Sequence, residues 1–122
     1  AEALRPLSLS QARTVGSAVL RAEALNTGQA VAQWARAEHD DATLPKRWAQ
    51  TAAERCLRSV RTLLNSFCYR GRRLSAYTDD GWADVMAEAA AREARAPAGS
   101  ATGGIARAFE GLIADFYRRL DA

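Results

Sequence analysis

The sequence predicts an all-α protein, a compact five-helix bundle that forms a single domain over residues 1–122. Apolar residues recur at intervals of three and four along the chain, and no segment shows the alternation of apolar and polar residues that a half-buried strand requires. The length of 122 residues is typical of one domain, and the 48% of hydrophobic residues suffices for a core. Short connections between amphipathic helices favour a bundle.

The first two helices are expected over residues 10–25 and 27–38. Ser8 or Ser10 is the expected N-cap of the first helix. The apolar face expected for this helix consists of Ala12, Val15, Ala18, Val19 and Ala22. The run 26–28, Asn-Thr-Gly, predicts a break, and Thr27 is the expected cap of the second helix. The polar residues His39, Asp40 and Asp41 are expected to connect it to the third.

The third helix is expected to begin near Pro45, because proline is tolerated in a first turn. Its apolar face fills an arc of about 160° at 100° per residue, and its expected members are Ala49, Ala53, Cys56, Leu57, Val60, Leu63, Leu64 and Phe67. A helix that continues past Arg70 adds Leu74 to this face. Cys56 and Cys68 then lie about 18 Å apart, too far for a disulfide, so both are expected to stay reduced.

The last two helices are delimited by capping signals. Thr78 is the expected cap of the fourth, Asp79 and Asp80 occupy its first turn, and Pro97 follows its end. The apolar stripe expected for this helix is Trp82, Val85, Met86, Ala89 and Ala90. Residues 98–104 are expected to be a flexible connection. The fifth helix, over about 105–120, is expected to turn Phe109, Leu112, Ile113, Phe116 and Leu120 inward.

Positive charge is concentrated in one segment. Residues 46–73 contain eight of the seventeen basic residues and one acid, Glu54, so this segment carries a formal +7 and the rest of the chain −4. Such a field attracts phosphate-rich polymers or acidic protein surfaces. On an unbroken helix most of these side chains lie opposite the apolar face, in a ridge about 39 Å long. The candidate nucleic-acid-binding residues are Lys46, Arg47, Trp48, Arg55, Arg58, Arg61, Arg70, Arg72 and Arg73.

Other interpretations of the basic ridge remain open. It is compatible with an ordinary solvated helix face, although such a face usually interleaves both signs of charge. Carboxylates of the same chain, those of Asp79, Asp80, Asp84 and Glu88, are expected to neutralise it if they pack against it. Trp48 lies outside the apolar arc near Arg55, where an exposed indole would be a platform for stacking bases.

Catalytic chemistry is not indicated. His39 is the only histidine, so the chain cannot form a multi-histidine metal site. The glycines at 99, 103 and 104 lack the Gly-Lys-Ser/Thr ending of a phosphate-cradling loop. No serine or cysteine has an identifiable base, so no enzyme activity and no cofactor are expected. No apolar run approaches the about 20 residues of a membrane span, and no secretory signal is visible, so a cytoplasmic protein is expected.

The basic segment 46–73 and the five-helix layout resemble the small helical subunits of RNA-guided CRISPR effector complexes, which serve antiviral defence. The resemblance implies copies arranged along a complex, with Arg47, Arg55, Arg58, Arg61, Arg72 and Arg73 contacting phosphates without reading bases.

The expected function is broader than that family. We expect a non-catalytic subunit of a larger assembly, which binds the backbone of RNA or single-stranded DNA and contacts other protein subunits but no membrane. The alternative is a helical adaptor whose arginine face docks on an acidic protein. A third class, a small-molecule regulator, would require an apolar cavity in the bundle.

Overall fold

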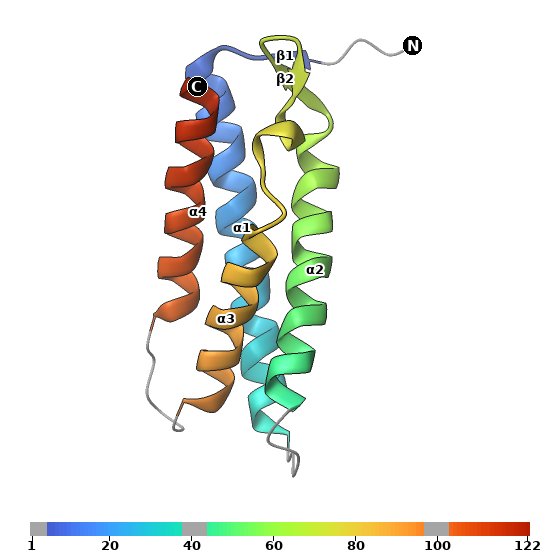
Figure 1. Cartoon of the computed structure of the whole chain (residues 1–122), viewed down its shortest axis with the longest axis vertical. Coiled ribbons are helices and arrows are strands. Elements are labelled where there is room, and N and C mark those ends of the chain that lie inside the picture. The colour runs from blue at the N-terminus through green and yellow to red at the C-terminus, as the bar shows by residue number, and fades with distance from the viewer. Residues whose placement is uncertain (1–4, 38–43, 97–102) are drawn as a thin grey trace.

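The computed structural model describes residues 5–37, 44–96 and 103–122 and is mostly helical. Four helices, α1 (Leu9–Arg36), α2 (Leu44–Leu64), α3 (Trp82–Arg95) and α4 (Gly104–Asp121), stand side by side along the long axis and alternate in direction (Figure 1). Each helix packs against its neighbours in sequence and α1 also packs against α4, so α2 and α4 lie diagonally across the bundle. The prediction of a helical bundle is confirmed, but the prediction of five helices is wrong.

A small sheet covers one end of the bundle, next to both the beginning of α1 and the end of α2 (Figure 1). It contains β1 (Arg5–Pro6), β2 (Phe67–Tyr69) and β3 (Arg72–Arg73) in that order. Strands β1 and β2 are parallel, with Arg5 opposite Phe67, and β2 and β3 are antiparallel, with Tyr69 opposite Arg72. The sequence pattern did not predict these strands, because two or three residues are too few to show an alternation.

The helix count differs because α1 is continuous where a break was predicted. Ser8 is the N-cap: its hydroxyl accepts from the Gln11 N–H at 3.1 Å, and the Gln11 side chain accepts from the Ser8 N–H at 2.9 Å. Asn26, Thr27 and Gly28 lie inside the helix. A glycine in a helix costs only about 1 kcal/mol relative to alanine. The contact of Thr27 with Cys56, the burial of Val31 and the stacking of Trp34 on Trp48 can outweigh this cost.

The buried face of α1 is also rotated from the predicted one. Val15 and Val19 are half-buried, but Ala18 and Ala22 are exposed, and the fully buried positions are Ala12, Gly16, Ser17, Leu20 and Val31. The partner helix explains this orientation. A Cβ on Gly16 would lie 2.1 Å from Cε2 of Phe116, so the ring of α4 fits against α1 only where α1 has a glycine.

Helix α2 corresponds to the predicted third helix. It has Pro45 in its first turn, as predicted, but it ends at Leu64. Most of the predicted apolar face is buried, whereas Leu63 is 48% exposed and Phe67 belongs to β2. The helix gives way to a hairpin whose two-residue turn, Arg70-Gly71, has positive φ at both positions, 52° and 73°. That conformation matches the twist of paired strands and favours glycine at the second position.

A short 3₁₀ helix, η1 (Leu74–Tyr77), leads from the hairpin into α3. The α-helix begins at Trp82 rather than directly after Thr78, whose hydroxyl instead donates to the Ser75 carbonyl at 2.6 Å. Within the predicted stripe of α3, Trp82, Met86 and Ala90 are buried but Val85 is 43% exposed. Helix α4 matches its prediction, and all five of its predicted inward residues are buried.

Both cysteines are free thiols, but they do not share a helix, because Cys68 lies in β2. Cys56 is buried in the core, where burial raises the pKa of its thiol to about 11. It is therefore protonated at neutral pH. The predictions for His39, Asp40, Asp41 and Gly99 lie outside the described residues. None of the helices in the described ranges combines the length and apolarity that a membrane crossing needs.

Candidate nucleic-acid interface

The nine predicted site residues do not form one helical ridge. Six of them belong to α2, and the other three, Arg70, Arg72 and Arg73, belong to the hairpin beyond its end. The physical reason is the turn at Arg70-Gly71, because two consecutive residues with positive φ cannot continue an α-helix. The prediction of a 39 Å helical ridge is therefore wrong.

Trp48 is not the exposed stacking platform that the sequence indicated. Its ring stacks on Trp34 of α1, with the centroids 5.2 Å apart and the planes 21° apart, and it is half-buried against the core. The helical projection placed Trp48 outside the apolar arc of α2. A large side chain at the margin of that arc nevertheless reaches the neighbouring helix.

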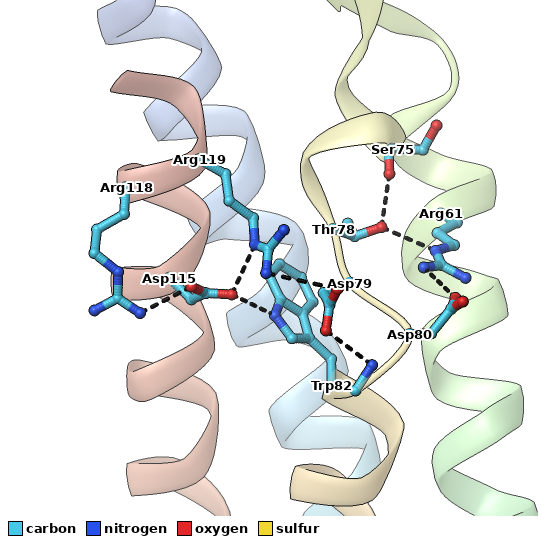
Figure 2. A network of polar contacts seen from close by, with 10 residues as sticks. Arg61, Ser75, Thr78, Asp79, Asp80, Trp82, Asp115, Arg118 and Arg119 are labelled. Carbon is cyan, nitrogen blue, oxygen red and sulfur yellow. Dashed lines mark hydrogen bonds and ion pairs between the residues drawn. The ribbon is translucent and has the colours of Figure 1, made fainter. Parts of the chain in front are cut away.

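Arg61 faces the protein rather than the solvent. Its Nε donates to the Thr78 hydroxyl at 2.9 Å, and an Nη lies 2.8 Å from Asp80 (Figure 2). The guanidinium thereby joins α2 to the segment that precedes α3. For Arg61, the alternative of neutralisation by the chain's own carboxylates is the correct one.

A second set of polar contacts joins α4 to the same segment (Figure 2). Asp115 accepts from the indole of buried Trp82 at 2.8 Å and from Arg118 and Arg119 at 2.8 and 2.9 Å. Arg119 also lies 3.6 Å from Asp79, whose carboxylate accepts from the Gly81 N–H at 3.0 Å. We call the contacts that Figure 2 draws the polar network.

The polar network strongly favours the ionised form of Asp115. The hydrogen bond from Arg119 is the largest cause, the bond from Trp82 comes second, and together with Arg118 they hold the pKa of this carboxyl well below its usual range despite partial burial. A carboxylate that is already bonded on several sides is poorly suited to proton transfer near neutral pH. The geometry indicates a structural role for Asp115.

Two arginines remain on the outer face of α2. Arg55 and Arg58 are exposed, and no described carboxylate lies within ion-pair distance of either. Glu54, the single acid of the basic segment, accepts instead from the Gln50 amide at 3.2 Å. Lys46 and Arg47 are exposed in the first turn of the same helix.

Four further arginines gather on the sheet, and we call Arg5, Arg70, Arg72 and Arg73 the basic cap. Three of them lie over aromatic rings: Arg5 over Phe67 at 5.9 Å, Arg70 over Tyr69 at 5.4 Å, and Arg72 over Tyr77 at 5.2 Å. Each such contact contributes about 0.5–1 kcal/mol at an exposed site. All four arginines are exposed. The three stacked guanidinium groups have one face against a ring and N–H groups available to a ligand.

The rings beneath the basic cap are themselves fixed. Tyr69 and Tyr77 are buried, their centroids lie 6.0 Å apart, and the Tyr77 hydroxyl donates to the Tyr69 carbonyl at 2.8 Å. Stacking on a rigid ring reduces the freedom that an arginine loses when it binds a ligand. The basic cap is in this sense preorganised for planar, bidentate contacts with phosphate or carboxylate groups.

Arg73 connects the basic cap to α2. It donates to the carbonyl of Asn65, the first residue after α2, at 3.3 Å, where a cation also complements the helix dipole. Asn65 lies seven residues after Arg58 and hence on nearly the same side of the helix, about 10 Å further along the axis. The basic cap thus continues the outer face of α2, and together with Arg55 and Arg58 it forms what we call the basic surface.

The basic surface also includes a residue that sequence reasoning missed. Arg5 precedes the basic segment by more than forty residues and reaches it only because β1 pairs with β2. No local pattern indicates that pairing. The turn, by contrast, is indicated by Gly71, because the pair Arg70-Gly71 stands between Phe-Cys-Tyr and Arg-Arg-Leu.

Within the three described ranges, no group of three or more His, Cys, Asp or Glu side chains is placed to hold a metal ion. No family model, curated protein or solved structure matches this chain.

Proposed function

We propose that the protein is a non-catalytic helical module that binds the phosphate backbone of nucleic acid through the basic surface. The observation that carries this proposal is a set of six exposed arginines, at positions 5, 55, 58, 70, 72 and 73, that no described carboxylate pairs with. Crowding of this many unpaired cations on one surface costs stability through repulsion, and a polyanion relieves it.

The composition of the surrounding chain supports the same proposal. The sequence contains no Asp or Glu from Arg55 to Thr78, and none from Ala3 to Ala22, the segment that provides β1 and the first half of α1. Among the described residues, six acids lie on α3 and α4, and Asp79 and Asp80 lie in the segment before α3. The field at the basic surface is therefore positive over a wide area rather than at isolated points.

Backbone binding is favoured over base recognition because of where the aromatic rings lie. Tyr69 and Tyr77 are buried beneath arginines, and Trp48 is stacked on Trp34. The two tyrosines therefore offer no free face to an unpaired base, and Trp34 already occupies one face of Trp48. Contacts from guanidinium groups to phosphates carry no sequence information, so we expect similar affinity for strands of different sequence.

Binding to labelled strands tests the proposal. Fluorescence anisotropy with single-stranded RNA, single-stranded DNA and duplex DNA of equal length should show saturable binding, with less than about a threefold difference between two sequences of the same strand type. Poly-glutamate is the competitor that represents an acidic protein. Displacement by poly-glutamate at lower charge concentration than by nucleic acid would favour the adaptor alternative.

Membership of a larger assembly is part of the proposal. The likeness to small helical CRISPR subunits stays a prediction, and it concerns only the helical architecture and the basic character. Co-purification from the native host tests it: the protein should elute with RNA that nuclease treatment removes, together with further subunits. Elution as a protein free of nucleic acid and of other chains would contradict this part.

A further inference from the structure

The second half of α1 is poorly covered by the rest of the bundle. Between Arg21 and Arg36 only Val31 is buried, whereas the first half of the helix contains four buried residues. Leu25 in this half is 64% exposed, more than any other large hydrophobic residue in the described ranges. Burial of a leucine side chain contributes about 1.5–3 kcal/mol, so a partner that covers Leu25 would be stabilised by the contact.

A groove lies directly beside Leu25, between α1 and α4. It has a volume of about 510 Å³ and is lined mainly by apolar or small residues, which are Ala24, Gly28 and Ala32 from α1 and Ile105, Ala106 and Phe109 from α4. A Cβ on Gly28 would meet no atom within 4 Å, so the helix surface is open there. A protruding leucine and an apolar hollow therefore occupy the same face.

We propose that this face binds a second copy of the chain in a two-fold symmetric dimer. A two-fold interface requires one surface to be self-complementary, and a projection next to a hollow meets that requirement. The exposed residues Ala18, Ala22, Leu25, Gln29 and Ala32 recur at intervals of four and three, the spacing with which two helices meet along a seam. The small residues on this stripe permit a close approach of the two α1 helices.

Charge fixes an antiparallel orientation. Arg36 is exposed at one end of the stripe, and no described carboxylate lies within ion-pair distance of it. The other end lies beside exposed Glu110 of α4, which pairs with Arg21 at 3.1 Å. An antiparallel arrangement that centres on Thr27 places Arg36 of each copy opposite Ala18 of the other, about one helical turn from the Arg21–Glu110 pair. At that separation the long arginine side chain can reach the Glu110 carboxylate, which can accept from both arginines.

The size of the face sets the expected affinity. The stripe from Ala18 to Arg36 is about 27 Å long, and two helices side by side are about 20 Å wide. Each copy would bury roughly 500 Å², about 1,000 Å² in total, which is at the lower limit of specific interfaces. We therefore expect a dissociation constant in the micromolar range.

The dimer would leave the basic surface accessible. The groove is formed by α1 and α4, and α2 stands diagonally opposite α4. A dimer through this groove would therefore have two accessible copies of the basic surface, one on each subunit. This inference concerns a different surface from the proposed function, so either can fail without the other.

Sedimentation equilibrium over about 1–300 µM tests the dimer. The mass should rise with concentration from 13.2 kDa toward about twice that value. Leu25→Lys and Gly28→Lys should each weaken dimerisation at least about tenfold, because each places a charge in the apolar face. The matched controls are Leu63→Lys and Gly111→Lys, since Leu63 is also exposed and Gly111 also faces open space, and neither lines the groove.

The outcomes are distinct. A single 13 kDa species at every concentration would overturn the proposal, as would equal weakening by the groove variants and their controls. Circular dichroism of each variant establishes that it is folded. Anisotropy with labelled RNA at a protein concentration below the dimerisation range should be the same for Gly28→Lys and Gly111→Lys, which separates loss of the dimer from any change in the basic surface.

Discussion

The basic surface and the polar network use the same residue type for opposite purposes. Arg58 and Arg61 stand one helical turn apart on α2, yet Arg58 points to solvent, whereas Arg61 bonds to Thr78 and Asp80. The difference arises from position around the helix, because residues three apart differ by about 60°. Both side chains border the hollow between α2 and the segment before α3, but only Arg61 lies within bonding distance of Asp80. The number of arginines in a segment is therefore a poor measure of its binding surface, and the presence of a carboxylate partner is a better one.

The largest effect should come from neutralising the hairpin part of the basic cap. Changing Arg70, Arg72 and Arg73 to Gln removes three phosphate contacts of about 1 kcal/mol each, so affinity for labelled RNA should fall roughly a hundredfold. The matched control changes Arg92, Arg95 and Arg107 to Gln. These arginines are exposed on α3 and α4, and their substitution removes the same formal charge of three. That control should lose less than about fivefold; equal losses would indicate that only net charge matters.

Disrupting the polar network should instead affect folding. Asp115→Ala leaves the indole N–H of buried Trp82 without its acceptor, and we expect the free energy of unfolding to drop by about 2 kcal/mol. Urea denaturation measures the change. The control is Asp84→Ala, because this α3 carboxylate makes no ion pair within the described residues and contributes only about 0.5 kcal/mol through the helix dipole. Similar losses in the two variants would show that the network is not a structural element.

The pair Arg58 and Arg61 sharpens the comparison within one helix. Arg61→Gln should lower the free energy of unfolding by about 1 kcal/mol and change RNA affinity less than twofold, because its guanidinium is already engaged. Arg58→Gln should do the reverse, with about a fivefold loss of affinity and unchanged stability. Measurement of both properties on both variants is required. An affinity loss for Arg61→Gln as large as that for Arg58→Gln would contradict the separate roles.

The smallest effect concerns acid pH. The pKa of Asp115 is lowered in the folded protein, whereas an unfolded Asp titrates near 3.9. Its contribution to stability is therefore fully present above about pH 5 and is lost as the pH falls below about 4 and toward the folded pKa. Between pH 5 and 3, wild type should lose about 1 kcal/mol more than Asp115→Asn, as measured by urea denaturation at each pH. Parallel curves for the two proteins would exclude a depressed pKa at this position.

Helix patterns in the sequence predicted most of the fold, and the failures have specific causes. The stripe of α4 and the core face of α2 followed from apolar spacing, because both helices are strongly amphipathic. The orientation of α1 did not follow from apolar spacing, because Gly16 is buried where the ring of Phe116 on α4 packs against it. The prediction of a break at residues 26–28 was wrong, because the helix propensity cost of about 1 kcal/mol is smaller than the gain from the few contacts that this part of α1 makes with α2.

The candidate site was predictable only in part. Charge counting found the basic segment, but it assigned Arg61 to the solvent and could not find Arg5. Both errors concern tertiary contacts, one with Asp80 across nineteen residues and one through a strand pairing. The hairpin was the avoidable error, because Gly71 after a short aromatic run is a recognisable turn signal.

The salt dependence of nucleic-acid binding tests the basic surface most directly. Engagement of six phosphates by the six arginines predicts that the logarithm of the association constant for single-stranded RNA falls with the logarithm of salt concentration at a slope of about −4, at −0.7 per phosphate. The Arg70, Arg72 and Arg73 variant should reduce the slope to about −2, whereas the Arg92, Arg95 and Arg107 control should retain it. A wild-type slope near zero, or equal slopes for the two triple variants, would contradict binding through the basic surface.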